Sequence, residues 1–157
     1  MRVHRVLVKP LAAGITTLTG AEAHHLLQVL RVREGSQVQG FDGAGLEAPG
    51  VVARVDDLTV DLGFETPQTA SNEARRQLIA AIALLKGDRL SDAVRMLTEL
   101  GIHEVRPFIS RYCSIQVLSA NKLERLRRVA REATKQCERA VVPTIHEAVK
   151  LEQLELE

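Results

Sequence analysis

The chain has 157 residues and a formal net charge of +1, and 45% of its residues are hydrophobic while only 3% are aromatic. This length and apolar fraction allow one ordinary domain or two small ones. The near-zero charge argues against a uniformly basic nucleic-acid binder, and the few aromatics argue against a large base-stacking platform. We expect neither a membrane span nor a secretory leader, because no apolar run reaches about 20 residues and the N-terminus lacks an apolar core.

The first part of the chain predicts a small β-barrel. Apolar and alternating runs indicate four strands, at 3–8, 36–41, 46–55 and 58–64. A helix is expected from Thr19 to about Arg33, since Leu26, Leu27 and Leu30 recur at helical spacing. The polar stretch 67–73 contains Pro67, Ser71 and Asn72 and is typical of a linker. We therefore expect a first domain over residues 1–66 and a second over 74–157.

The second domain begins with a βαβ pattern. An apolar run from Leu78 to Leu85 predicts a buried strand, and the helical spacing after Asp88 predicts a helix that Gly101 closes. A further apolar run, Ile102 to Ile109, predicts the next strand. Such units build parallel sheets whose ligands lie beyond the carboxyl ends of the strands. Lys86 and Arg111 follow these two strands, so they are candidates for binding phosphates; the alternative is that both reach into solvent.

The next predicted helix, from Lys122 to Arg139, carries the densest charge. It holds seven Lys or Arg against three Glu, an excess of four. Because its apolar stripe must face the sheet, these cations face water or a polyanion such as RNA. A solvated face with compensating pairs such as Glu124–Arg128 is the competing interpretation. Glu132 and Gln136 lie four residues apart and either contact a partner or pair within the helix. Residues 147–157 suggest a last helix.

Cysteine and histidine usage indicates no metal site. Cys113 and Cys137 lack metal-ligand spacing, so we expect reduced thiols in a cytoplasmic protein. The five histidines form no ligand pattern, and adjacent His24 and His25 diverge by about 100° on a helix.

Several short motifs together resemble one family, the small-subunit ribosomal RNA uridine methyltransferases of the SPOUT (trefoil-knot) superfamily. In the second domain these are Lys86-Gly87-Asp88, Thr98-Glu99-Leu100-Gly101, and Glu132, Gln136 and Arg139 before Val142-Pro143. In the first they are His4-Arg5, Ala23-His24-His25, Val29-Leu30-Arg31 and Phe41-Asp42-Gly43. Glu138 departs from the family, which usually has a small residue there, commonly glycine.

The resemblance implies a PUA-like RNA-binding barrel followed by an α/β SPOUT methyltransferase domain with a parallel sheet. It implies methyl transfer from S-adenosylmethionine to N3 of a uridine in 16S ribosomal RNA, by a cytoplasmic homodimer without metal. The RNA-contact residues expected on this basis include cations of the barrel, of the strand ends and of the charged helix: His4, Arg5, Arg31, Arg33, Lys86, Arg111, Arg128, Glu132, Gln136 and Arg139.

The family's glycine-rich Gly-Pro-Glu-Gly-Gly loop and its later Leu-Gly segment, which form the knot and hold the cofactor, do not occur in the sequence. We therefore expect an incomplete methyltransferase domain, with no catalytic or cofactor-binding residue in this chain and no activity of the chain alone. Two other interpretations stay open: a non-catalytic RNA-binding module, and a small-molecule α/β enzyme that binds a phosphorylated metabolite.

Overall fold

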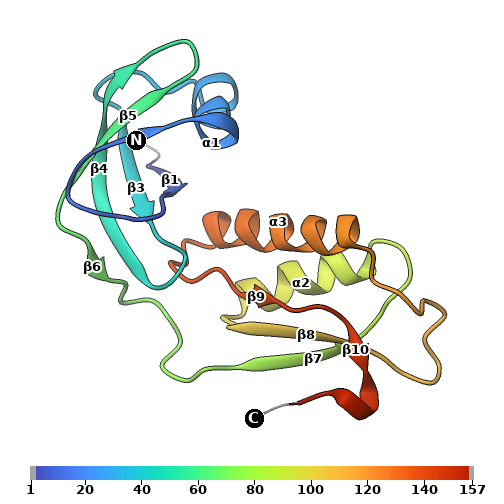
Figure 1. Cartoon of the computed structure of the whole chain (residues 1–157). Helices are drawn as coiled ribbons and strands as arrows, with labels where there is room; N and C mark the ends of the chain where they lie inside the picture. Colours follow the sequence, from blue (N-terminus) through green and yellow to red (C-terminus); the bar gives the residue numbers. More distant parts are fainter. Residues whose placement is uncertain (1–2, 156–157) are drawn as a thin grey trace. The chain divides into compact units, whose positions relative to one another are not determined.

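The computed structural model describes residues 3–155, and the chain divides into two compact units between Ser71 and Asn72 (Figure 1). Each unit has its own cluster of buried apolar side chains. A two-unit architecture is what the polar stretch between two apolar patterns predicts.

The first unit is built on one mixed sheet of six strands. These are β1 (His4–Leu7), β2 (Gly14–Leu18), β3 (Gln37–Phe41), β4 (Leu46–Val55), β5 (Val60–Phe64) and β6 (Gln68–Thr69). The hydrogen-bonded order is β1-β3-β4-β5-β2, and β6 pairs with β4. The β1–β3 pairing is parallel and the others are antiparallel. The four predicted strands are thus confirmed, while β2 and β6 carry too little apolar alternation to be read from sequence.

The core of this unit forms because the strands alternate. Val38, Val52 and Leu62 are at most 1% exposed and point to one side of the sheet. The ring of Phe64 packs closely on the backbone of Gly50, where an added Cβ would lie 2.5 Å from a ring atom. Any side chain at that position would displace the ring, so glycine allows the sheet to close tightly on its core.

A short helical segment covers part of the same core. It comprises α1 (Gly20–His24) and one π-helical turn, η1 (His25–Val29), which bury Ala23 and Leu26. The expected helix extended to about Arg33, which is too long. Arg31 has a φ of 53°, a left-handed conformation that ends the helical path.

The second unit contains the predicted βαβ arrangement. Its elements are β7 (Ile79–Ala83), α2 (Arg89–Glu99), β8 (Glu104–Ile109), α3 (Ala120–Gln136), β9 (Thr144–Ile145), β10 (Val149–Lys150) and the 3-10 turn η2 (Leu151–Gln153). β7 pairs with β8 in parallel, with Ala83 opposite Phe108. Gly101 closes α2 with a φ of 93°, and the amide of Ile102 donates to the carbonyl of Leu97. This is the glycine-terminated helix end that the sequence predicts.

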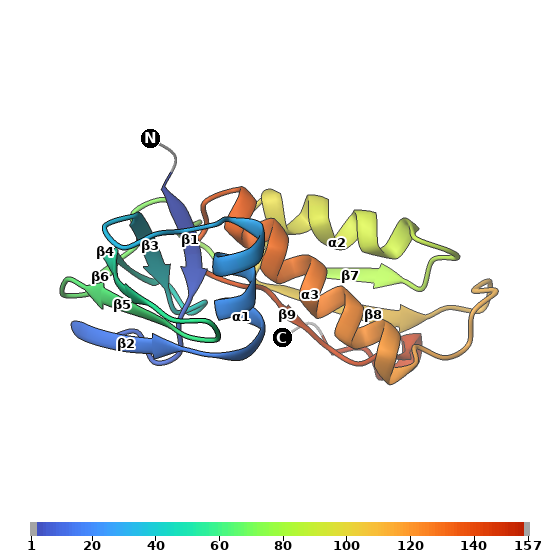
Figure 2. The ribbon, with the colours of Figure 1, turned by 90° about the horizontal axis from the view of Figure 1, so that it is seen from above.

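Helices α2 and α3 pack side by side on one face of this sheet (Figures 1 and 2). Leu90 and Val94 of α2, Leu126 of α3 and Val105 of β8 are fully buried between these layers. Ser119 caps α3, since its side chain accepts a hydrogen bond from the amide of Lys122. The helical spacing of apolar residues therefore assigned the correct faces to the core.

One prediction about a chain segment needs correction. The helix expected within residues 147–157 is not formed by the residues described there, because Val149 and Lys150 join the sheet edge beside Phe108 and Ile109. The expected linker at 67–73 contains the boundary between the two units, and its first part pairs with the first unit: β6 pairs with β4, and the amide of Ala70 donates to the carbonyl of Gly45. Among the residues that the structure describes, no helix is long and apolar enough to cross a membrane.

Candidate nucleic-acid interface

The carboxyl ends of β7 and β8 place two predicted residues at one edge of the sheet. The two strands run in parallel, and the amide of Leu84 donates to the carbonyl of Phe108 at 2.9 Å. Lys86 therefore follows β7, and Arg111 follows β8, from the same level of the sheet. Both residues are exposed. The sequence argument that brings them to one edge is supported by this register, and we call the two residues the strand-end cations.

The loop that carries Lys86 is anchored to the next helix. Gly87 adopts a φ of 68°, which permits the tight turn between β7 and α2. Asp88 forms an ion pair with Arg125 of α3 at 2.7 Å. Both side chains are at least half exposed, so the contact orients the loop more than it stabilises the fold.

Most cations of α3 are already paired with acids of the protein itself. Arg127 and Arg131 both contact Glu124, at 3.9 and 3.1 Å, and Lys135 contacts Glu132 at 3.4 Å. The excess of four already subtracts these glutamates, so only acids from outside the segment lower it, Asp88 on Arg125 and Glu73 on Arg139, which leaves an excess of two. The helix thus partly matches the internally compensated face that competes with RNA binding, although Glu124 pairs with Arg127 and Arg131 instead of the expected Arg128.

Three other predicted residues share an exposed stripe of α3. Arg128, Glu132 and Gln136 follow one another at four-residue intervals and are all exposed. This placement makes them accessible to a partner. Glu132 also forms an ion pair with Lys135. The stripe therefore presents one cation, one carboxylate and one amide to a partner.

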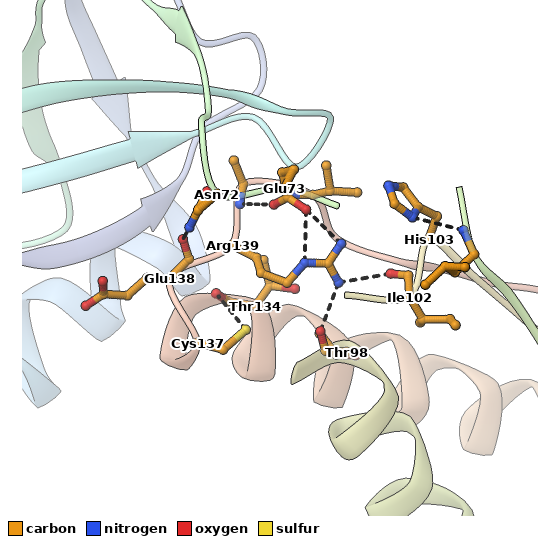
Figure 3. A network of polar contacts seen from close by, with 12 residues as sticks. Asn72, Glu73, Thr98, Ile102, His103, Thr134, Cys137, Glu138 and Arg139 are labelled. Carbon is orange, nitrogen blue, oxygen red and sulfur yellow. Dashed lines mark hydrogen bonds and ion pairs between the residues drawn. The ribbon is translucent and has the colours of Figure 1, made fainter. Parts of the chain in front are cut away.

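Arg139 is the clearest failure among the predicted RNA contacts. Its side chain is buried at 6% exposure and forms an ion pair with Glu73, with Nη2 at 2.9 Å from Oε2 (Figure 3). Nη1 donates to the backbone carbonyls of Thr98 and Ile102, at 2.9 Å each. A guanidinium held on three sides by the protein is not presented to RNA. Arg139 also lies where the strands begin, at the end of the sheet opposite the strand-end cations.

Glu73 completes this buried network, and sequence analysis missed it because it lies in the expected linker. Its Oε1 accepts from the amides of Ala140 and Val141, at 2.6 and 2.9 Å. Burial raises the pKa of Glu73, but the hydrogen bonds from Arg139 and from these two amides outweigh it, so the net pKa lies below its ordinary value. We call Glu73 and Arg139 the clasp, since they tie residues 72–73 to the ends of α2 and α3.

The backbone conformation beside the clasp explains why a glycine is usual at position 138, where this chain has Glu138. Glu138 follows the end of α3 with a φ of 61°, and the amide of Arg139 donates to the carbonyl of Thr134. This is the helix ending in which glycine is usual, because other residues are strained there. A small residue at this position is therefore favoured by backbone conformation.

The predicted contacts in the first unit differ in their availability. Arg31 and Arg33 are exposed in the loop after η1, and His4 is half-buried on β1. Arg5 is turned into the unit: its side chain is 12% exposed, pairs with Glu47 at 3.3 Å and lies over the Phe41 ring at 5.2 Å. A partly buried arginine with two protein partners is a poor candidate for phosphate contact, so we correct the prediction for Arg5.

The two units match two family models. A model described as an RNA methyltransferase domain matches residues 72–156, and one described as an RNA methyltransferase PUA domain matches residues 18–65. The two matched ranges correspond to the two compact units of the structure. The chain belongs to the RNA methyltransferase family.

Individual relatives agree with this assignment. The chain is 35% identical to "Ribosomal RNA small subunit methyltransferase E" of Synechocystis, over 90% of this chain and 46% of that protein. It is 32% identical to the protein of the same name from Rickettsia conorii, over 97% and 62%. The chain thus spans about half to two thirds of the length of these relatives. It shares its fold with ribosomal RNA small subunit methyltransferase E of Neisseria gonorrhoeae bound to S-adenosyl methionine, with a TM-score of 0.87, 23% identity and coverage of 98% and 67%.

A groove of about 570 Å³ in the second unit tests whether this chain can hold that cofactor. It lies between the end of β8 and the start of α3, with Gln116 and Arg127 among its polar lining residues. Both are engaged within the chain: Gln116 donates to the carbonyl of Cys113, and Arg127 donates to that of Ile145. Among the described residues, no glycine lines the groove to let backbone approach an adenosine. The residues that line this groove therefore do not fit S-adenosylmethionine.

Proposed function

We propose that the chain is the RNA-docking part of an S-adenosylmethionine-dependent methyltransferase that modifies N3 of a uridine in 16S ribosomal RNA. The observation that carries the docking role is the exit of Lys86 and Arg111 from adjacent parallel strands, exposed, at one edge of the sheet. Their charges suit the phosphates of RNA, which bind through counterion release. Arg31 and Arg33 supply further exposed cations from the PUA-like unit.

The proposed reaction needs catalytic and cofactor-binding groups that we do not assign to the described residues. A ring nitrogen of uridine carries a proton that must leave before methylation, and a nearby cation stabilises the resulting anion. We assign no catalytic residue to the described residues. The relatives named as methyltransferases are markedly longer than the matched region, so the cofactor site, the trefoil knot and the homodimer are proposed for the whole protein. A cytoplasmic location, where ribosomes are, belongs to the same proposal.

The docking role is tested by RNA affinity as a function of salt. The 157-residue chain is titrated into a labelled 16S ribosomal RNA fragment and followed by anisotropy at several salt concentrations. The double variant Lys86→Glu, Arg111→Glu should bind about tenfold or more weakly, and the salt slope should fall by about 0.7 for each phosphate of a single strand that the variant no longer neutralises. Arg95→Glu is the matched control, because Arg95 is exposed on α2 and pairs with Asp92 away from that edge. Equal slopes for all three proteins would refute the docking surface.

The enzymatic role is tested with a hybrid protein. The chain alone, given S-adenosylmethionine and unmodified small ribosomal subunits, should transfer no methyl group. A hybrid that adds the part of the Rickettsia conorii relative lying outside the matched region should methylate one uridine. Transfer by the chain alone would refute its proposed incompleteness. A hybrid that binds RNA but stays inactive would favour the non-catalytic RNA-binding module.

A further inference from the structure

The loop after β8 exposes an aromatic ring beside the strand-end cations. Tyr112 is the only tyrosine of a chain that has no tryptophan. Its side chain is 88% exposed, whereas the rings of Phe41 and Phe64 belong to residues that are 0% and 6% exposed. We infer that Tyr112 is a stacking residue for an unpaired base of single-stranded RNA. This inference rests on the proposed function and extends it from phosphate contact to base contact.

A tight turn holds Tyr112 in place. The amide of Cys113 donates to the carbonyl of Ser110 at 3.1 Å, which closes a turn with Arg111 and Tyr112 at its tip. The Cys113 sulfur lies 3.3 Å from both the amide and the hydroxyl of Ser110, and these hydrogen bonds lower the pKa of the thiol. Gln116 donates to the Cys113 carbonyl at 2.6 Å and braces the loop from the other side. The tip residues are thus presented on an ordered backbone, which lowers the entropic cost of binding.

The pair at the tip has the chemistry of a base clamp. The guanidinium carbon of Arg111 lies 5.8 Å from the centre of the Tyr112 ring, so the cation contacts the π-system. Every nucleobase has a flat face that stacks on an aromatic ring or a guanidinium, and its phosphate is attracted by the same cation. Lys86 emerges from the neighbouring strand at the same edge and supplies a second charge for the RNA backbone. A duplex hides its base faces, so single-stranded RNA is the form that this arrangement binds.

The fluorescence of the single tyrosine reports directly on a base that stacks against it. Because Tyr112 is the only tyrosine and tryptophan is absent, intrinsic fluorescence excited at tyrosine wavelengths comes from this side chain. Short oligo-uridine RNA should quench that emission as it binds. An abasic sugar–phosphate oligomer of the same length should bind through its phosphates and leave the emission unchanged.

Variants separate stacking from charge. Tyr112→Ala should weaken oligo-uridine binding about tenfold, consistent with the usual contribution of one stacked base, and leave the salt slope unchanged. Tyr112→Phe keeps the ring and should bind within about twofold of the original chain. Leu100→Ala is the matched control, since Leu100 is 77% exposed at the far end of α2.

The outcomes distinguish this inference from the function on which it rests. If labelled oligo-uridine binds with the expected salt dependence while tyrosine emission and the Tyr112→Ala affinity stay unchanged, stacking is refuted and phosphate docking survives. If neither oligomer binds at any salt concentration, the docking function is refuted, and stacking with it. Quenching by oligo-uridine alone, together with retained affinity of Tyr112→Phe, establishes the base contact.

Discussion

The two ends of the parallel sheet in the second unit use cationic side chains in opposite ways. Where the strands begin, Arg139 is buried against Glu73 and two backbone carbonyls. Where they end, Lys86 and Arg111 are exposed. The difference arises because a carboxylate from residue 73, far away in sequence, reaches one end, whereas Asp88, beside the other end, forms its ion pair with Arg125 and not with the strand-end cations. A cation at an end of this sheet is therefore buried in the fold or left exposed according to which acid the fold brings to it.

The largest expected effect comes from removing the clasp, which tests whether Arg139 stabilises the fold. Arg139→Ala leaves Glu73 without its main partner in a largely buried position and should lower the free energy of unfolding by about 3 kcal/mol, as for other broken buried pairs. Urea unfolding followed by circular dichroism measures this. The affinity for RNA of the folded fraction should not change. Arg95→Ala, which removes an exposed pair, is the control and should cost less than about 0.5 kcal/mol. Similar destabilisation of the two variants would contradict the structural role of Arg139.

The clasp also predicts a dependence of stability on acid. The pKa of Glu73 is lowered in the folded state, so the stability it contributes is fully present above its ordinary value of 4.5 and is lost as the pH falls through the lower folded value. Urea unfolding from about pH 5 to about pH 3 should show a steeper loss for the original chain than for Glu73→Gln, which cannot titrate. The pKa of Glu104 is lowered as well, mainly by its hydrogen bond from Arg106, so both proteins keep that background dependence. Parallel curves would show that Glu73 does not supply the difference.

The residues that end α2 and α3 beside the clasp allow a test of backbone strain. Gly101 and Glu138 both follow a helix with positive φ, at 93° and 61°. Because the glutamate is strained there, Glu138→Gly should raise the free energy of unfolding by about 1 kcal/mol, and Gly101→Ala should lower it by a similar amount. Thermal and urea unfolding of the two variants measure both signs. A destabilised Glu138→Gly would mean that its carboxylate makes a contribution larger than the backbone strain.

The sequence predicted the elements of both units better than it predicted their polar contacts. Periodicity located the helices over Arg89–Glu99 and Ala120–Gln136 and the strands they cover, because burial imposes a regular spacing on apolar residues. It missed β2, whose residues are mostly exposed, and it extended the helix beyond Leu30 because it does not register the left-handed Arg31. Register then supported the shared edge of Lys86 and Arg111.

The spacing of apolar residues could not predict the clasp. Glu73 and Arg139 are separated by 66 positions, and their pairing depends on the folded path of the intervening βαβ unit. The polar composition around Glu73 indicated a linker, and the charge density around Arg139 indicated a surface. Tyr112 was missed for a related reason: a low aromatic content argues against a large stacking platform but does not locate a single ring at the tip of a turn.

The smallest expected effect concerns the acid at the strand-end edge. Asp88→Asn removes a negative charge close in sequence to Lys86 and frees Arg125 from its ion pair. The Asp88 side chain makes no capping hydrogen bond to α2, and both partners are at least half exposed, so the unfolding free energy should change by at most about 0.5 kcal/mol.

RNA affinity should rise about twofold in Asp88→Asn, because less repulsion opposes the phosphates, and the salt slope should steepen slightly if Arg125 joins the contact. Asp92→Asn is the matched control, since it frees Arg95 one helical turn further along α2. The same anisotropy titration resolves the difference. If Asp88→Asn weakened binding, the Arg125–Asp88 pair would be a positioning device for the Lys86 loop, and the contrast between the two ends of the sheet would be one of degree, because a carboxylate would then orient the cations at both.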